Sequence, residues 1–412
     1  MDPEGHTIRG ARIALPELIQ EFYARRGFGP AWSDPALANE LRKALADSYH
    51  DGLDPADYHL PLLKQLAVEA DSPQATAELR AQNDILMTEG LLRLAYHLSF
   101  GKVDPESFDP QWNYGRTLAE TDVIGEIDTA IASCRLYDRI EALKPTHPVY
   151  VALKRELVRY RAFEATGGWT PLPGGPTLKA GASDERVPEL RRRLIVSGDL
   201  PSQAASDPPI YDEEMVNAVR RYQERTGLDP DGAVGGATLK EINVPVTDRI
   251  RQLRINLDRG RVLLQDLPQE FVIVNIAGFT AYFVRGSQIV WTSRVQVGKP
   301  YRRTPIFRSE ISYLVWNPTW TVPPGIIAND ILPAARKDPE SITRKGLKVI
   351  DSSGRVIDPA SVDWSRYRSG NIPYTLRQDP GPSNALGRVK LMFQNSYLVY
   401  LHDTPSQNLF ER

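Results

Sequence analysis

The stretch Phe271-Val272-Ile273-Val274-Asn275-Ile276 marks a change in the pattern of the chain. Before it, apolar residues recur at helical spacing, whereas after it short runs rich in Val, Ile, Tyr and Phe alternate with turn residues. The later runs lie at 281–284, 289–297, 311–316, 390–393 and 397–401. Short strands without long intervening helices favour a sandwich or small barrel over a βαβ fold. We therefore expect 271–276 to form a buried strand within a multidomain α+β protein.

The chain divides into domains on both sides of this change. Before it we predict a helical scaffold, a Gly/Pro-rich linker, a three-helix bundle and a helical connector, at 1–165, 166–179, 180–246 and 247–267. After it, 268–412 is predicted to be a β-sandwich-like domain with a capping insertion at about 323–373, in which 326–336 is helical. A long insertion in a β domain is typical of a lid over a cleft.

Composition excludes several classes of protein. The 412 residues carry a net charge of −2 and one cysteine, which argues against a dedicated nucleic-acid binder, a disulfide framework and cysteine-rich metal sites. The charge is uneven, because 268–412 has 18 Lys and Arg against 11 Asp and Glu, a net +7, whereas 1–267 has a net −9. The C-terminal part therefore suits an anionic substrate. The longest mostly apolar stretch, 271–284, is too short to span a membrane as a helix, and no signal-peptide pattern is visible.

The predicted three-helix bundle carries a recognisable order of residues. Asp212 is placed to cap its second helix, and glycines end the first two helices. The residues that define the order are Leu190, Leu194, Val219, Tyr222, Gln223, Gly227, Leu228, Asp231, Gly232 and Thr238. This order is similar to the peptidoglycan-binding type 1 module. The alternative is an ordinary helical bundle that serves as a spacer.

His402 is the histidine best placed for chemistry. It follows the predicted strand 397–401, and a ring at a strand end can be held rigidly while it faces a cleft, as a general base requires. His97 lies beside Leu94 and Leu98 on a helical pattern, so we expect a structural role for it. None of the six histidines belongs to an HExxH motif or forms an i, i+4 pair, so neither a metal site nor another cofactor is predicted.

Six blocks in the C-terminal region carry a resemblance to a known family. They include Val297-Gly298-Lys299-Pro300-Tyr301-Arg302-Arg303-Thr304-Pro305 and Tyr400-Leu401-His402-Asp403-Thr404-Pro405, and the others lie at 274–276, 313–323, 358–364 and 380–387. The region resembles the YkuD-type L,D-transpeptidase catalytic domain, in the large periplasmic subfamily that also has a helical scaffold and a peptidoglycan-binding module. Weaker matches in the N-terminal half are Trp32, 50–53, Tyr58 and 101–103.

The resemblance implies an enzyme that joins peptidoglycan stem peptides. A cysteine thiolate would attack the carbonyl of an L-centre in a donor tetrapeptide and release D-alanine, and an acceptor amine would then complete a 3→3 crosslink. It places the general base at His402 and the cysteine in a Ser/Thr-x-Gly-Cys turn shortly downstream. No such turn precedes Arg412, so the nucleophile is expected beyond it, and the chain as given is expected to be inactive and not to react with carbapenems. Cys134 falls on an apolar helical face with Ile127 and Ile131, and we expect it to be buried.

Further residues are predicted to bind the substrate: Tyr301, Arg302, Arg303, Trp320, Asn384 and Gly387. The two arginines could meet stem-peptide carboxylates or belong to a solvated basic loop. Trp320 could line a groove or pack under the insertion, and for Trp316 we predict packing. Gly387 would allow close backbone approach at the floor of the cleft.

The resemblance also implies the partners and the location. We expect peptidoglycan stem peptides and glycan as partners, no nucleic acid, membrane association only through an N-terminal segment outside this chain, and a monomer in the periplasm. The alternative is a non-catalytic peptidoglycan-binding scaffold protein. A serine or metal hydrolase would need a Gly-x-Ser-x-Gly elbow or clustered His and Glu ligands, and the sequence contains neither.

Overall fold

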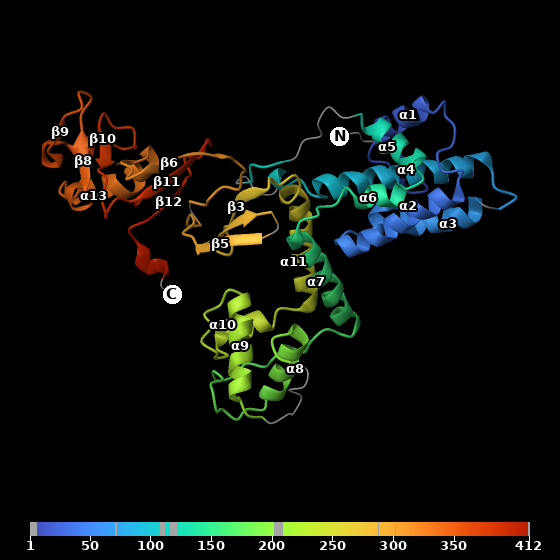
Figure 1. Ribbon diagram of the computed structural model, residues 1–412, viewed down its shortest axis with the longest axis horizontal. Helices are drawn as coiled ribbons and strands as arrows, with labels where there is room; N and C mark the ends of the chain where they lie inside the picture. The colour runs from blue at the N-terminus through green and yellow to red at the C-terminus, as the bar shows by residue number, and fades with distance from the viewer. Residues whose placement is uncertain are drawn as a thin grey trace. The chain divides into compact units, whose positions relative to one another are not determined.

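A computed structural model of the chain describes residues 6–70, 72–107, 112–115, 122–201, 209–286, 288–300 and 302–410. Helices dominate before residue 268 and strands after it, which confirms a multidomain α+β protein (Figure 1). The chain forms two units, one of Met1–Phe108, Gly115–Ile273 and Tyr282–Trp291 and one of Asp109–Tyr114, Val274–Ala281 and Thr292–Arg412. Within the described ranges no helix is both long and apolar enough to cross a bilayer.

The helices of the first unit begin at ordinary capping residues. Asp34 accepts a hydrogen bond from Ala36 N at 2.8 Å at the start of α2, and Thr76 accepts one from Leu79 N at 3.1 Å at the start of α4. The N-terminal elements are β1 Thr7–Ile8, β2 Ala11–Arg12, α1 Pro16–Arg25, α2 Pro35–Asp47, α3 Leu60–Ala70, α4 Ala77–Phe100, α5 Val123–Ala132 and α6 Leu136–Glu141. The remaining helices of this unit are α7 Pro148–Ala165, α8 Val187–Ser197, α9 Glu213–Arg225, α10 Gly236–Ile242 and α11 Val246–Leu263.

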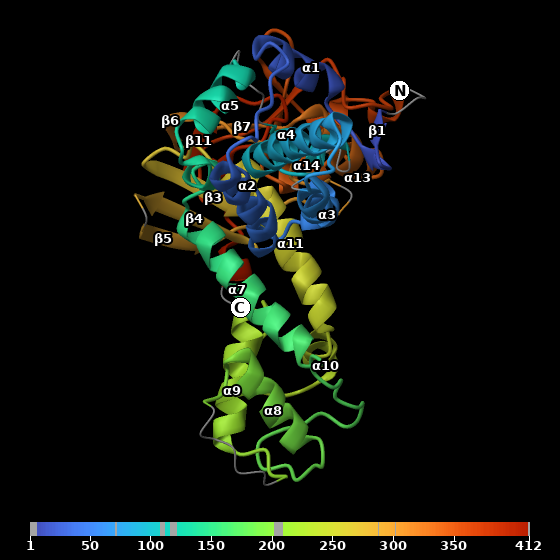
Figure 2. The same ribbon diagram turned by 90° about the vertical axis from the view of Figure 1, so that its right-hand side faces the viewer.

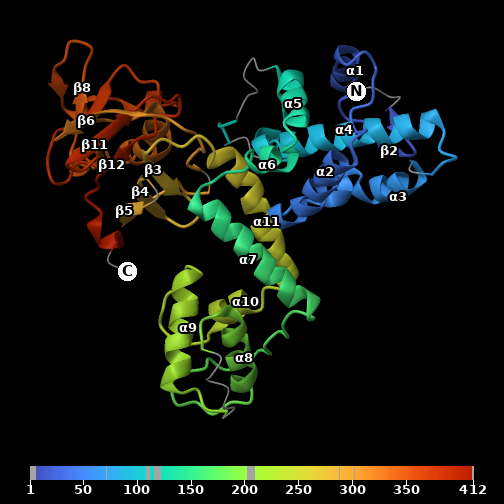
Figure 3. The same cartoon turned by 45° about the vertical axis from the view of Figure 1, so that its right-hand side comes forward.

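Buried Asp51 joins the N-terminal helices to α7 and α11, which lie side by side in all three views (Figure 2 and Figure 3). Its carboxylate forms ion pairs of 2.7 Å with Lys144 and with Lys154. Asp258 on α11 accepts a hydrogen bond from Lys102 N at 2.8 Å. Because the loss of one partner from a buried ion pair is strongly destabilising, the sequence motif that contains Asp51 has a structural explanation. The motif that contains Lys102 is held by the backbone hydrogen bond to Asp258.

The helices α8, α9 and α10 form the predicted three-helix bundle around the buried amide of Gln223. Its Nε2 donates to Asp231 Oδ1 at 2.8 Å and to Thr238 Oγ1 at 3.0 Å, and its Oε1 accepts from Gly232 N at 2.8 Å. Asp212 caps α9 by accepting a first-turn N–H at 2.9 Å, as predicted. The residues that define the sequence order therefore hold the turns of the bundle to its second helix.

Two three-stranded sheets form the frame of the C-terminal region. The first contains β3 Glu270–Asn275, β4 Thr280–Arg285 and β5 Gln288–Arg294 in chain order, with connections too short for a parallel crossover. The second has the order β12-β11-β6, built from β6 Ile311–Trp316, β11 Val389–Phe393 and β12 Leu401–His402. In its antiparallel register Lys390 lies opposite His402 and Leu391 opposite Leu314.

The insertion between β6 and β11 has a sheet and a core of its own. Its sheet has the order β7-β10-β8-β9, from β7 Trp320–Thr321, β8 Leu347–Ile350, β9 Val356–Ile357 and β10 Thr375–Gln378. Its helical segments are α12 Pro324–Ile326, a π-helical turn Ile327–Ile331, α13 Leu332–Ala335 and α14 Ser341–Arg344, which confirms a helix in 326–336. Buried Leu332, Val349, Trp364 and Leu376 belong to its core.

The prediction that 271–276 is a buried strand was wrong in its burial. The strand forms, but its residues are half-buried or exposed. The apolar side chains of β5 and β6 are also largely exposed, with Trp291 53% and Trp316 70% accessible, so the predicted packing of Trp316 was wrong as well. Apolar content predicted these strands correctly, whereas burial also depends on a second layer that covers them.

The predicted strand 397–401 was too long. Only Leu401 and His402 pair with β11. The reason is Asn395, whose Oδ1 accepts hydrogen bonds from Tyr397 N at 3.0 Å and from Val399 N at 3.1 Å. An asparagine that bonds to the backbone just after itself competes with strand pairing, and Leu398 adopts a positive φ of 57°.

Candidate functional site

The end of β12 places His402 beside a firmly bonded turn. Asp403 N donates to Val389 O at 2.9 Å, and Asp403 Oδ2 accepts from Arg388 N at 2.9 Å. These bonds hold both the backbone and the side chain of Asp403 against the start of β11. The hydrogen bond from Arg388 N is the main cause that lowers the pKa of the Asp403 carboxyl, so this residue is an anion at neutral pH.

The ring of His402 is exposed and has one nitrogen engaged. Its Nδ1 lies 2.5 Å from the carbonyl oxygen of Asp403. A carbonyl oxygen only accepts, so Nδ1 carries the hydrogen and the neutral ring has its lone pair on Nε2. The fold therefore fixes a tautomer that can accept a proton at Nε2, as a general base requires.

Gly387 and Asn384 shape the loop that faces Asp403. Gly387 has a φ of +61°, and a Cβ at this position would lie 2.5 Å from Asp403 Cγ, so the close approach requires glycine. Asn384 is 1% exposed, and its Nδ2 donates to Pro318 O at 3.0 Å and to Asp379 O at 2.9 Å. Its Oδ1 accepts from Leu386 N at 2.8 Å. The amide of Asn384 is thus used within the protein, where it positions this loop.

The basic loop before β6 is tied to the insertion. Arg302 forms an ion pair with Asp330 at 2.7 Å, and Gly298 N donates to Thr304 Oγ1 at 2.8 Å across the base of the loop. Arg303 is exposed and has neither a hydrogen bond nor an ion pair with another described residue. Tyr301 lies outside the described residues. Of the predicted cations, Arg303 is therefore the one available to an anionic ligand.

Trp320 is neither fully packed nor fully exposed, so it lies between its two predicted roles of packing under the insertion and lining a groove. It lies on β7, opposite Gln378 of β10, and is half-buried against the core of the insertion. Trp316 and Tyr313 of β6 are more exposed, at 70% and 58%. The sequence therefore predicted too little exposed aromatic surface near the candidate base, because Trp316 was expected to be packed.

Cys134 does not occupy the predicted core position. It is exposed, with a φ of 51°, in the turn after α5, which ends at Ala132. The helical spacing that placed it with Ile127 and Ile131 does not extend past the end of the helix. No group of three or more His, Cys, Asp or Glu side chains in the described ranges could hold a metal ion.

Sequence reasoning missed Asp403 and Asn395. Asp403 anchors the candidate base, and Asn395 fixes the turn that leads into β12. Their sequence signals were an acidic residue directly after the histidine and an asparagine two residues before the predicted strand. Both residue types commonly bond to nearby backbone groups, which is a signal that could have been used.

The sequence matches three protein-family models in the order of the observed domains. Residues 17–157 match a scaffold domain, 183–242 match a family described as "Putative peptidoglycan binding domain", and 269–412 match the L,D-transpeptidase catalytic domain YkuD. The fold and these matches define a multidomain chain that is similar, part by part, to three known domain families. Its C-terminal third is similar to the L,D-transpeptidase catalytic domain of the YkuD type, and the preceding parts are similar to a peptidoglycan-binding domain and a scaffold domain.

Two curated relatives agree with these matches. A Haemophilus influenzae protein named "Putative L,D-transpeptidase" is 38% identical over 175 residues, which are 42% of this chain and 34% of that protein. The N-acetylmuramoyl-L-alanine amidase CwlL of Bacillus licheniformis is 41% identical over 69 residues, 16% of this chain and 19% of the amidase. The chain thus spans about a third of the first relative's length and about a fifth of the second's.

Proposed function

We propose that the C-terminal domain catalyses peptidoglycan L,D-transpeptidation and that His402 is its general base. The observation that carries this proposal is the exposed imidazole at the end of β12, with Nδ1 engaged by Asp403 O at 2.5 Å and Nε2 left to accept a proton. A thiol needs such a neighbour to become a thiolate. The reaction would join stem peptides through a cysteine acyl-enzyme and give 3→3 crosslinks, in the periplasm.

The electrostatics around His402 support an acidic substrate. Residues 268–412 have a net charge of +7, and Arg303 presents an exposed cation without a partner among the described residues. Stem peptides carry carboxylates, which arginine binds well through paired hydrogen bonds. We propose Arg303 and Trp320 as substrate contacts, Arg302 as a further cation held by Asp330, and Asn384 and Gly387 as residues that shape the loop beside His402.

The nucleophile is the part of the mechanism that residues 268–412 do not provide, because their sequence contains no cysteine. The single cysteine of the chain, Cys134, belongs to the scaffold domain, in the turn after α5. We propose that Cys134 takes no part in the reaction, that the catalytic cysteine is supplied beyond Arg412, and that the 412-residue chain is inactive.

Intact-mass measurement with a carbapenem tests this proposal. The 412-residue chain is expected to show no adduct, and a stable adduct would show that a nucleophile is present within it. A chain extended to include a Ser/Thr-x-Gly-Cys turn is expected to be acylated. His402→Gln in that extended chain should slow acylation by about a hundredfold, within the usual range for loss of a general base. Acylation at an unchanged rate would remove His402 from the mechanism.

The second candidate function is a non-catalytic peptidoglycan-binding scaffold. It is favoured by the placement of the single cysteine in the scaffold domain, whereas the bundle matches a binding family. A pull-down of the 412-residue chain on purified peptidoglycan tests binding without chemistry. Binding by the 412-residue chain and no acylation of the extended chain would favour the scaffold function.

A further inference from the structure

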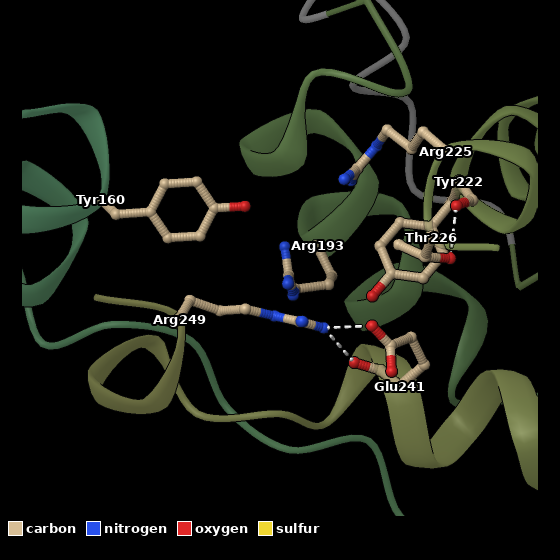
Figure 4. A pocket seen from close by; sticks show the side chains of 7 residues that line it. All are labelled: Tyr160, Arg193, Tyr222, Arg225, Thr226, Glu241 and Arg249. Atoms are coloured by element: carbon tan, nitrogen blue, oxygen red, sulfur yellow. Dashed lines mark hydrogen bonds and ion pairs between the residues drawn. The ribbon is translucent and has the colours of Figure 1, made fainter. Parts of the chain in front are cut away.

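A pocket with a volume of about 260 Å³ lies where the bundle meets α7 and α11 (Figure 4). Three arginines line it, one each from α8, α9 and α11, together with tyrosines from α7 and α9. Glu241 of α10 is its acidic lining residue. All of these side chains belong to the first unit, whereas His402 belongs to the second.

Arg193 of α8 is a buried cation without an anionic partner. It is 4% exposed, its buried Nε has no hydrogen-bond partner, and its side chain forms no ion pair with any other described residue. Its guanidinium stacks on the ring of Trp169 at 3.7 Å, and the indole N–H of Trp169 donates to Val244 O at 3.0 Å. Burial is the main cause that lowers the pKa of Arg193; Tyr222 and Tyr160 act against it, and Arg225 and Arg249 add to it. A buried charge that is not paired costs free energy, which a bound anion would recover.

Tyr222 of α9 brings a second unused donor to the same pocket. Its ring is 1% exposed, and its hydroxyl has no hydrogen-bond partner among the described residues. Burial raises the pKa of Tyr222, so the hydroxyl keeps its proton and remains a donor. Figure 4 shows Tyr160 of α7 facing Arg193 from the opposite wall. Buried polar groups are normally satisfied, so two unused donors in one pocket indicate a missing acceptor.

The other charged residues of the pocket already have partners. Arg249 forms an ion pair with Glu241 at 2.6 Å, as Figure 4 shows. Arg225 donates from Nε and Nη2 to both carboxylate oxygens of Asp199, at 2.7 and 2.6 Å. The acidic lining residue, Glu241, is therefore paired with Arg249, and the positive charge of Arg193 has no anionic partner among the described residues.

We propose that this pocket binds a carboxylate group of a peptidoglycan stem peptide, with Arg193 and Tyr222 as its donors. A carboxylate offers two acceptor oxygens to one guanidinium and one hydroxyl, and the pocket has room for the group and its neighbouring atoms. The choice of a stem peptide rests on the proposed function of the chain and on the match of 183–242 to a peptidoglycan-binding family. The bundle would thus contact the peptide of the wall polymer as well as its glycan.

Isothermal titration of the full chain with a free stem tetrapeptide tests the proposal. The tetrapeptide is expected to bind, and an analogue with its carboxyl groups converted to amides should bind at least about tenfold more weakly. Acetate and inorganic phosphate serve as separate probes. Equal affinity for the tetrapeptide and for inorganic phosphate would overturn the assignment to a stem peptide, and no binding of the tetrapeptide would overturn the site.

Two variants separate binding from folding. Arg193→Gln should weaken tetrapeptide binding about tenfold to a hundredfold, while the Tm stays unchanged or rises because an unpaired buried charge is removed. Tyr222→Phe should weaken binding about threefold to tenfold without lowering the Tm, since its hydroxyl has no internal partner. The matched control is Arg155→Gln, on the exposed face of α7, which should leave both unchanged.

The same variants distinguish this site from the proposed chemistry. Unchanged tetrapeptide binding by Arg193→Gln, or lost binding together with a lowered Tm, would overturn the role of Arg193. Neither result would bear on His402, because acylation is measured on the catalytic domain by mass. Conversely, failure of acylation in the extended chain would leave tetrapeptide binding by the bundle intact.

Discussion

The three-helix bundle and the three-stranded sheets of the C-terminal domain are both rich in apolar residues. They differ in how far the apolar side chains are buried. In the bundle, Leu194 and Val219 are fully buried. On β6, Leu314 and Trp316 are largely exposed, although the strand was predicted from equally apolar residues. A bundle of about sixty residues can close its own core, whereas a sheet needs a second layer that distant sequence must supply.

The largest expected difference is in the free energy of unfolding, when the same Leu→Ala substitution is made in each of the two regions. Leu194→Ala in the bundle should lower the free energy of unfolding by about 2 to 5 kcal/mol, because it leaves a cavity among buried neighbours. Leu314→Ala on β6 should lower it by less than about 1 kcal/mol, since that side chain is 49% exposed. Urea unfolding followed by tryptophan fluorescence measures both. Equal losses would mean that β6 is covered in solution.

The second prediction concerns His97, a buried histidine in the helical region. His97 accepts or donates a 2.9 Å hydrogen bond with Tyr58, and burial, with help from Lys102 and Arg93, lowers its pKa from 6.5 to about 4. Between pH 6.5 and 4 the unfolded chain therefore binds a proton that the folded chain does not, so stability is present above pH 6.5 and is lost as the pH falls. The loss should reach about 2 to 3 kcal/mol.

Urea unfolding at pH 7.5 and 4.5 measures this contribution. In His97→Gln the difference between the two pH values should shrink by about that amount. An unchanged pH dependence in His97→Gln would contradict the assigned burial of the ring.

The third prediction concerns a closely packed point of the sheet region, the contact between Gly387 and Asp403. Gly387→Ala would push a Cβ to within 2.5 Å of Asp403 Cγ, at a φ of +61° that alanine adopts with strain. We expect a local cost of about 2 kcal/mol, read as roughly thirtyfold faster hydrogen exchange at Asp403 N. Gly381→Ala is the matched control, because a Cβ there meets no atom within 4 Å and no positive φ is required. Equal exchange in the two variants would argue against Gly387 as a support for the His402 turn.

The sequence predicted more of the bundle than of the site. The Asp212 cap, the glycine turns and the Gln223 region depend on local spacing, and the structure has them as predicted. The tautomer of His402 could not be predicted from the sequence, because it depends on the position of Asp403. That position is set by contacts with Arg388 and Gly387, which belong to an earlier loop. Contacts between segments that are distant in sequence leave no periodic signal.

The unpaired donors of the pocket beside the bundle could not be predicted from the sequence for a similar reason. Arg193 and Tyr222 lie on different helices, and each looks like an ordinary member of its helix in the sequence. Their lack of partners appears only when Glu241 and Asp199 are seen to bind other arginines. In the bundle the helical spacing predicts the buried apolar face, but it does not predict which buried charges remain unbalanced.

The smallest expected effect on stability tests the exposed apolar face directly. Trp316→Gln should change the free energy of unfolding by less than about 0.5 kcal/mol, because the ring has few neighbours to lose. Binding of the dye ANS should fall in this variant, since a large exposed apolar side chain is removed. Trp32→Gln should act in the opposite direction, because Trp32 is 7% exposed and its indole N–H donates to Thr88 Oγ1 at 2.9 Å, so its loss loosens a core and raises dye binding. If both variants raised ANS binding, Trp316 would be part of a core, and the contrast between the two regions would disappear.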